Sequence, residues 1–257
     1  MATNKNIEKL PGTRPEGIRD EREAAERVRE MFGRIAPRYD FLNHLLSFSL
    51  DHVWRRRTAE RFKHILDRQE AQVLDLCCGT GDLAFALERV RSATAGPVIG
   101  VDFVEGMLMR AHAKAGRVGH RAVFVAADAL DLPFPDASFD LVTSAFGFRN
   151  LANYEHGLRE IARVLRAGGE VGILEFSEPS SGPLASVFRF YFRQILPRIG
   201  GAISGSGEAY SYLPASVAKF PSPPELAQLM ATCGFGDTRF ESWNFGSVVL
   251  HRGKRES

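Results

Sequence analysis

The stretch Val73–Asp82, which reads VLDLCCGTGD, constrains the fold of this chain more than any other. It begins with a short apolar run of the kind that forms buried parallel strands. This run leads straight into Gly79-Thr80-Gly81, and a helical pattern follows. A strand, a glycine turn and a helix in this order let a ligand approach bare backbone at a helix N-terminus. We therefore predict that a nucleotide-like ligand binds at this turn.

The chain after Val73 alternates between strand and helix patterns. We expect strands at 72–77, 98–102, 122–126, 141–145 and 171–176, and helices at 82–91, 105–115, 154–165 and 182–196. Such alternation predicts an α/β doubly wound sheet, in which ligands bind at the carboxyl ends of the strands. The C-terminal part differs, because a helix at 221–233 is followed by two strands, 238–243 and 247–251, that turn at 244–246. This terminal β-hairpin is unlike the standard dinucleotide-binding fold.

The region before the first strand reads as a helical cap. We expect a disordered lead-in over residues 1–19 and a single domain over 20–257. Within it, a helix capped by Asp20 ends at Pro37, and a second helical stretch follows at about 50–66. Two interpretations of residues 20–66 stay open. They form either a cap packed on the core or a lid that closes over the glycine turn.

Composition narrows the class of protein. A formal net charge of +2 does not by itself imply a nucleic-acid partner, and none is expected. Three cysteines, none in metal-ligand spacing, predict neither a disulfide framework nor a metal site. No apolar stretch reaches the roughly 18 residues that span a bilayer, and the polar N-terminus is not a signal peptide. We expect a cytoplasmic protein.

Acidic residues after the strands point to an adenosine ligand. Asp102 follows the glycine turn by about 20 residues, the spacing at which a carboxylate accepts from ribose hydroxyls. Asp128 ends a later strand, where it could accept from an adenine amino group, and the N–H of Ala129 could reach the ring. Asp75 interrupts the first apolar run. It is either part of the ligand site or a structural carboxylate that bonds the turn's own amides.

The ligand can be a dinucleotide or S-adenosylmethionine. A short-chain oxidoreductase would carry Tyr-x-x-x-Lys, and none of the five tyrosines has a lysine four residues on. The terminal hairpin and the acid in the first strand favour S-adenosylmethionine.

Longer motifs are more selective than the glycine turn. Three are Tyr-Asp-x-x-Asn at 39–43, Phe-Gly-x-Arg-Asn at 146–150 and Tyr-x-Tyr-Leu-x-x-Ser-Val at 210–217. The stretches that match a known family are FGRIAPRYDFLN (32–43), DLCCGTGD (75–82), FGFRN (146–150), RVLRAGG (163–169), LEFS (174–177) and YLPASV (212–217). Over residues 28–253 the chain resembles the menaquinone/ubiquinone biosynthesis C-methyltransferases. These are class I S-adenosylmethionine-dependent enzymes that methylate a ring carbon of a polyprenyl quinol.

The resemblance implies a Rossmann-like class I methyltransferase. Its sheet would be seven-stranded and mostly parallel, with an antiparallel C-terminal hairpin and an N-terminal helical lid. The family's cofactor contacts fall on Thr80, Asp102, Asp128 and Ala129, and Gly79, Gly81 and Asp75 complete the expected donor site. The chain departs from the family in two places. Ala145 stands where a serine is common, with Ser144 one place earlier, and Ser49 replaces a usual glycine.

The resemblance also implies where the quinol is methylated. Arg149 and Asn150 would hold a phenolate or orient a water, although Arg149 could equally form a structural salt bridge. Tyr39 and Asp40 would close the site, and either Asp40 or a nearby histidine would accept the proton. Tyr210 and Tyr212 would line the ring pocket, or simply pack.

Residues 182–220 are predicted to be a substrate-side insertion. Its segment 187–196 is rich in aromatic residues and arginine, so it could meet a membrane surface, cover the tail channel, or form a cap or homodimer contact. Three functions are weighed: quinol C-methylation, methylation of another phenol or lipid, and a non-catalytic adenosyl-binding subunit.

Overall fold

The computed structural model describes residues 12–13, 20–40, 44, 47, 49–179 and 207–257. Of residues 38 and 207–211 it describes only the backbone. The predicted helix 182–196 and most of the predicted lead-in lie outside this set.

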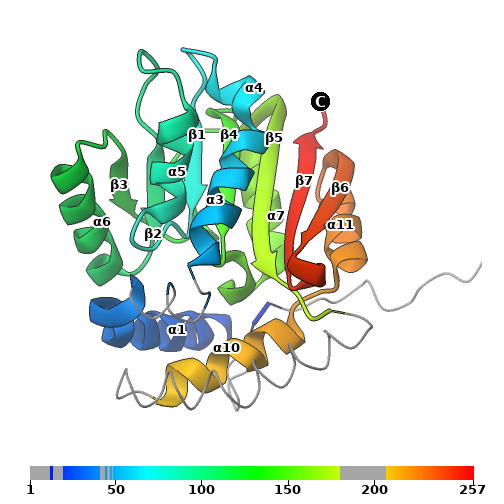
Figure 1. Ribbon diagram of the computed structural model, residues 1–257. Helices are drawn as coiled ribbons and strands as arrows, with labels where there is room; N and C mark the ends of the chain where they lie inside the picture. The colour runs from blue at the N-terminus through cyan, green and yellow to red at the C-terminus, as the bar shows by residue number, and fades with distance from the viewer. Residues whose placement is uncertain (1–11, 14–19, 41–43, 45–46, 48, 180–206) are drawn as a thin grey trace, which may run out of the picture.

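A seven-stranded sheet forms the centre of the molecule (Figure 1). In spatial order the strands are β3 (Val123–Ala126), β2 (Ile99–Asp102), β1 (Val73–Leu76), β4 (Phe139–Ala145), β5 (Leu165–Phe176), β7 (Val248–Arg255) and β6 (Phe235–Trp243). The first five are parallel to one another, and β7 runs antiparallel to both of its neighbours. The predicted mostly parallel sheet with an antiparallel C-terminal hairpin is confirmed.

β6 and β7 are longer than the predicted strands 238–243 and 247–251, and two other elements differ more. β5 begins at Leu165 rather than near residue 171, because Leu165 already pairs with Phe139 of β4, and pairing with β4 and β7 continues from Glu170 after an irregularity that contains the glycines. The single helical stretch at 50–66 is two helices, α3 (Leu50–Arg61) and α4 (Lys63–Leu66). Phe62 breaks it, and its ring packs so closely on Gly172 that a Cβ there would lie 2.5 Å away.

Helices cover both faces of the sheet, each over its own apolar core. On one face α3, α4, α5 (Asp82–Val90) and α6 (Glu105–Val118) bury residues such as Phe62, Leu83, Leu87 and Leu108. On the other face α7 (Tyr154–Val164) and α11 (Pro223–Thr232) bury Leu158, Ile161, Leu226 and Met230. A sheet buried on both sides needs apolar strands, which explains why β1 is apolar except for Asp75.

A cap crosses the carboxyl ends of the parallel strands (Figure 1). It consists of α1 (Glu21–Ile35), the short η2 (Ala36–Arg38) and α10 (Gly207–Lys219). As predicted, the Asp20 side chain caps α1 by accepting from the N–H groups of Arg22 and Glu23. α10 carries Tyr210 and Tyr212 on a helix that the sequence pattern did not predict. Among the described helices, none is both long and apolar enough to cross a membrane.

Candidate active site

A cavity opens at the carboxyl ends of β1, β2, β3 and β4, beneath the cap. It encloses about 960 Å³, including its open mouth. Predicted site residues that line it are Tyr39, Asp75, Gly79, Thr80, Asp102, Asp128, Ala129 and Asn150. Within the described part of the chain, Asp40, Gly81, Arg149 and Tyr212 lie outside this lining, and the side chain of Tyr210 is not described.

The glycine turn after β1 has a strained backbone. Cys77, Gly79 and Gly81 have φ values of 53°, 55° and 88°, in the left-handed region. At Gly81 a Cβ would lie 2.8 Å from the Phe124 ring, so this position requires glycine for packing as well as for its φ. A similar close approach explains the glycine of Phe-Gly-x-Arg-Asn. A Cβ on Gly147 would lie 2.4 Å from the Cβ of Cys77.

Asp102 is held rigidly at the end of β2. Its Oδ2 accepts from the Gly79 N–H at 2.8 Å, and its Oδ1 accepts from the Val104 N–H at 2.9 Å. Burial raises the pKa of this carboxyl, and these two N–H groups oppose the rise. The N–H of Phe103 also stabilises the carboxylate, and the lone pairs that remain are available to a ligand in the cavity, which Asp102 lines.

Asp128 is oriented in the same manner at the end of β3. Its Oδ1 accepts from the Leu130 N–H at 2.9 Å. Because Asp128, Ala129 and Leu130 all line the cavity, this side chain presents its remaining acceptor capacity beside an apolar wall. That combination suits a flat heterocycle with an exocyclic amino group.

Asp75 lies beneath the turn and is fully buried. Its Oδ1 accepts from the Thr143 hydroxyl at 3.0 Å, while no hydrogen bond reaches Oδ2 from the described residues. Burial raises its pKa to about 7, and the Thr143 hydroxyl and the N–H of Ala84, in the first turn of α5, partly oppose this rise. Asp75 thus has one oxygen without a partner among the described residues and also interacts with an amide of the turn region, and both interpretations of its role stay predictions.

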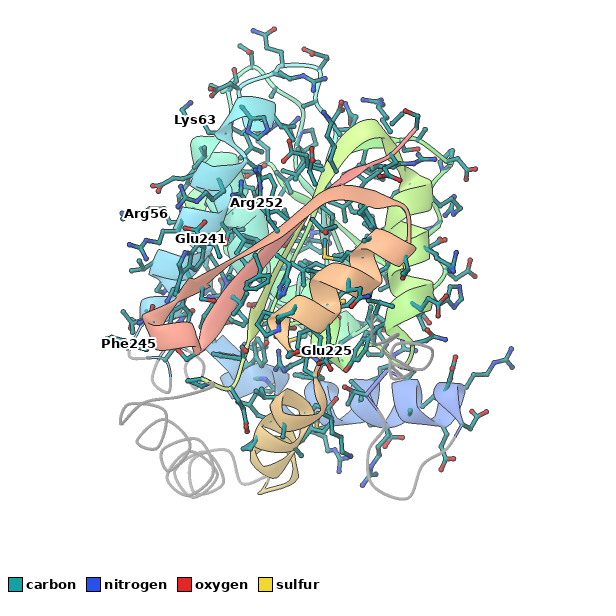
Figure 2. The ribbon with its side chains drawn as sticks, turned by 90° about the vertical axis from the view of Figure 1, so that its right-hand side faces the viewer. Arg56, Lys63, Glu225, Glu241, Phe245 and Arg252 are labelled. Atoms are coloured by element: carbon teal, nitrogen blue, oxygen red, sulfur yellow. The ribbon has the colours of Figure 1, made fainter. Side chains whose placement is uncertain are left out.

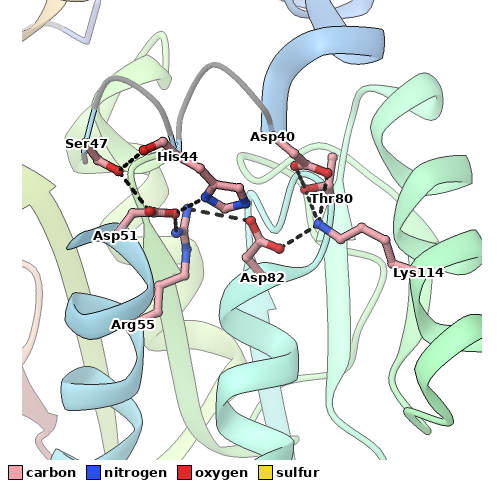
Figure 3. A network of polar contacts seen from close by, with 8 residues as sticks. All are labelled: Asp40, His44, Ser47, Asp51, Arg55, Thr80, Asp82 and Lys114. Atoms are coloured by element: carbon pink, nitrogen blue, oxygen red, sulfur yellow. Dashed lines mark hydrogen bonds and ion pairs between the residues drawn. The ribbon is translucent and has the colours of Figure 1, made fainter. Parts of the chain in front are cut away.

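A network of polar groups joins the cap to the glycine turn (Figure 3). The Thr80 hydroxyl donates to Asp40 at 2.5 Å and accepts from Lys114 at 3.0 Å. The Thr80 hydroxyl therefore has no proton left to donate to a ligand. Thr80 can contact a ligand only through the second lone pair of this oxygen or through its backbone. Tyr39, the neighbour of Asp40, lies over Gly79.

Arg149 is buried behind the cavity wall. Its Nη1 donates to Glu175 at 2.9 Å and also to the Phe146 carbonyl oxygen, and its N–H donates to Glu175 at 3.0 Å. Burial would lower its pKa, but Glu175, with smaller contributions from Tyr39 and Tyr212, raises it. The adjacent Asn150 reaches the cavity and accepts from the Tyr212 hydroxyl at 3.2 Å. Arg149 thus supports the loop that presents Asn150.

Four charged residues of this region were not singled out from the sequence: Arg55, Asp82, Lys114 and Glu175. Arg55 and Asp82 line the cavity, with Arg55 Nη2 4.0 Å from the Asp82 carboxylate. Burial would raise the pKa of Asp82, yet Arg55 and Lys114 hold it below its usual range. The run of arginines at 55–57 was a usable signal, but no local pattern shows which of the three points inward.

One group of metal-ligand side chains lies beside this network. Ligand atoms of His44, Asp51 and His52 lie within 4.8 Å of one another. Asp51 already accepts from His44, Ser47 and Arg55. Since the positive Arg55 lies against the same carboxylate, we assign no metal to this group.

Comparison with solved structures places the fold among methyltransferases. A methyltransferase from Thermotoga maritima, a possible histamine N-methyltransferase, aligns with a TM-score of 0.59 and 19% identity over 88% of this chain and 99% of its own. One from Aquifex aeolicus gives a TM-score of 0.57 and 17% identity over 77% and 89%. Both are described as dependent on S-adenosylmethionine. At this identity they establish the fold alone.

Comparison with known sequences is more specific. The chain is 48% identical to a demethylmenaquinone methyltransferase of Deinococcus radiodurans over 93% of this chain and 96% of that protein. A Thermus thermophilus enzyme of the same name is also 48% identical, over 88% and 100%. A ubiquinone/menaquinone biosynthesis C-methyltransferase of Geobacter sulfurreducens is 44% identical over 91% and 90%. Residues 20–255 match the ubiE/COQ5 methyltransferase family. The chain therefore belongs to this family and is an S-adenosylmethionine-dependent methyltransferase.

Proposed function

We propose that this enzyme methylates a ring carbon of a polyprenyl quinol, in menaquinone or ubiquinone biosynthesis. The observation that carries the proposal is the 48% identity to demethylmenaquinone methyltransferases over nearly the full length of both chains. Residues of the selective motifs lie at or next to the cavity. Tyr39, Phe146, Gly147 and Asn150 line it, and Tyr212 bonds to Asn150.

The charges of the cavity suit the methyl donor, whose sulfonium and ammonium are cationic. Among the described residues, the cavity lining contains one basic side chain, Arg55, and four acidic ones: Asp75, Asp82, Asp102 and Asp128. We assign the adenosine to the end formed by Asp102 and Asp128. The methionine portion then lies toward Asp75, Thr80 and Asp82, where the unpaired oxygen of Asp75 can accept from an ammonium.

The acceptor must be the reduced quinol. Bound S-adenosylmethionine supplies an electrophilic methyl group, and a quinone ring is itself electrophilic. Loss of the proton from a neighbouring hydroxyl makes the ring carbon electron-rich, so the protein has to align the ring and stabilise a phenolate. Asn150 is placed to contact the ring oxygen, and Arg149 positions Asn150 from behind. The other predicted role of Asp40, as proton acceptor, is disfavoured because Thr80 and Lys114 already occupy its carboxylate.

A transfer assay tests the function. The enzyme is incubated with methyl-labelled S-adenosylmethionine and either reduced demethylmenaquinol or a methoxy-polyprenyl-benzoquinol. Label in a quinol supports the proposal and identifies the ring. Label only in another phenol or lipid favours the second function, and donor binding without transfer to any acceptor favours a non-catalytic subunit. Arg149→Ala should lose turnover and keep donor affinity.

We propose peripheral contact with a membrane, since a polyprenyl tail keeps the substrate there. The β6–β7 hairpin turns at η5 (Asn244–Gly246), where Phe245 is 78% exposed with φ 59°. Figure 2 shows Phe245 at the end of the hairpin that faces the cap. A bulky residue in the left-handed region with its ring in solvent is unusual and suggests a role outside the fold. The other candidate segment, 187–196, lies outside the described residues, and a homodimer stays open.

A further inference from the structure

Lys114 lies at one end of the polar network beside the donor cavity, where it meets Asp40, Thr80 and Asp82 (Figure 3). Its Nζ donates to Asp82 Oδ1 at 2.6 Å, to Thr80 Oγ1 at 3.0 Å and to Asp40 Oδ2 at 3.1 Å. An ammonium has three protons, so these three acceptors use its full donor capacity. The side chain is 27% exposed and therefore only partly screened by water.

The three acceptors come from the two parts of the protein that meet over the cavity. Thr80 and Asp82 belong to the glycine turn and the start of α5, and both line the cavity. Asp40 belongs to the cap, next to Tyr39, which lines the cavity from the other side. Lys114 itself comes from α6 and lies behind the wall. It can therefore act on a ligand only through these neighbours.

The network extends beyond Lys114 to His44. Asp82 is 4.0 Å from Arg55, Arg55 pairs with Asp51, and Asp51 Oδ2 lies 2.8 Å from His44 Nδ1. Asp40 and His44 therefore both belong to this network of polar contacts. Without Lys114, Arg55 would still lie 4.0 Å from Asp82, but no cation would join Asp82 to Asp40, and repulsion between these two carboxylates would push Asp40 away from the turn.

We propose that Lys114 is a positioning residue for the methyl donor. It holds Tyr39 against the glycine turn and keeps Thr80 and Asp82 in place, so that the cap closes the methionine end of the cavity. This inference rests on the donor placement proposed above, but not on the identity of the acceptor.

Donor binding tests this without any quinol. Lys114→Met should weaken S-adenosylmethionine about tenfold in calorimetric titration, a loss in the range of one charged hydrogen bond. It should leave 5′-methylthioadenosine, which lacks the amino-acid portion, within about twofold of the parent protein, because Asp102 and Asp128 are untouched. In turnover, KM for the donor should rise while kcat at saturation changes little.

Lys63→Met is the matched control. Lys63 forms an exposed ion pair with Asp67 one helical turn away, so the same chemical change there should leave donor affinity unaltered. Asp40→Asn should reproduce the selective loss. Combined with Lys114→Met it should add little, because both changes break one interaction.

Two results would overturn the inference. Equal losses for both ligands would mean general damage to the cavity, and unchanged donor affinity in Lys114→Met would mean that the network has no positioning role. If Lys114→Met fails to fold, Asp40→Asn alone must show the selective loss. If the enzyme binds the donor but methylates no quinol, the result would count against the proposed function. It would not affect the inference about Lys114.

Discussion

A buried ion pair between Arg149 and Glu175 supports the loop that lines the cavity at Asn150. Arg149 is only 5% exposed and Glu175 1%, and they bond both through the guanidinium and through the backbone N–H of Arg149. The Tyr154 hydroxyl donates to the Arg149 carbonyl oxygen at 3.0 Å. This loop is thus held from several directions, which gives Asn150 a defined place at the cavity.

We predict that Glu175→Gln destabilises the protein by about 3 kcal/mol, because removing one partner leaves the other charge buried and unpaired. The loss would appear in urea unfolding. Glu170→Gln, on the same strand, changes a carboxylate paired with the exposed His64, and it should cost less than about 1 kcal/mol. Equal effects of the two substitutions would contradict a structural role for the buried pair.

Asp102→Asn should weaken S-adenosylmethionine at least about tenfold, as expected for the loss of hydrogen bonds to a charged group. An amide has one acceptor oxygen, so it cannot serve the N–H groups of Gly79 and Val104 and also a ribose. Calorimetric titration of the donor measures this. Asp67→Asn, at an exposed acid far from the cavity, should bind as the parent protein does. Unchanged affinity in Asp102→Asn would remove this residue from the donor site.

Elements far apart in the chain are locked together at the edge of the cap. The indole N–H of Trp54 in α3 donates to the Asn244 side-chain oxygen at 2.7 Å, and the Arg57 guanidinium lies 5.8 Å from the Trp243 ring centroid. The hairpin turn is therefore fixed against α3, and Phe245 projects from a rigid base.

Phe245→Gly should weaken binding to vesicles that contain anionic lipid and quinol about tenfold, the order expected when one aromatic side chain no longer leaves water. Its stability should stay the same or rise by up to about 1 kcal/mol, because glycine adopts a positive φ without strain. Flotation and urea unfolding measure the two effects. Met109→Gln, at an exposed apolar residue of α6, should not change vesicle binding. Intact flotation of Phe245→Gly would exclude the hairpin as the contact.

At the scale of the whole molecule, two buried groups oppose each other in how stability depends on pH. The folded state raises the pKa of Asp75 to about 7 and lowers that of His251 to about 4, in each case through burial. Between pH 4 and 6.5, folded Asp75 keeps a proton that the unfolded chain loses, which lowers stability as pH rises. Over the same range the unfolded chain holds a proton that folded His251 lacks, which raises stability as pH rises.

Single substitutions should reveal each contribution in the free protein. The quantity compared is the free energy of unfolding of the parent protein minus that of Asp75→Asn. This difference should fall by about 4 kcal/mol as pH rises from 4 to 8. The corresponding difference between the parent protein and His251→Gln should rise by about 3 kcal/mol as pH rises from 4 to 7. Urea unfolding across this range measures both. A difference that stays flat with pH for Asp75→Asn would show that Asp75 is ionised in the folded protein.

Much of the architecture could be predicted because local patterns encode it. The apolar run of β1, the glycine turn, the Asp20 cap and the Asn244–Gly246 turn all lie as expected. The errors arose where partners distant in sequence decided the outcome. The start of β5 depends on the pairing of Leu165 with Phe139 of β4, and Phe62, where the predicted helix breaks, packs against Gly172.

By itself, the sequence determined the order of the seven strands and of helices α5, α6, α7 and α11, the position of the glycine turn and the family, because periodicity, turn residues and motifs are properties of short segments. Only the tertiary structure decided which charges meet. Lys114 and Asp40 are separated by 74 residues, and Arg149 and Glu175 by 26. Their pairing follows from the strand order of the sheet and from the cap laid across its end. No local pattern could therefore show that Arg149 supports the cavity from behind, or that Lys114 joins the cap to the turn.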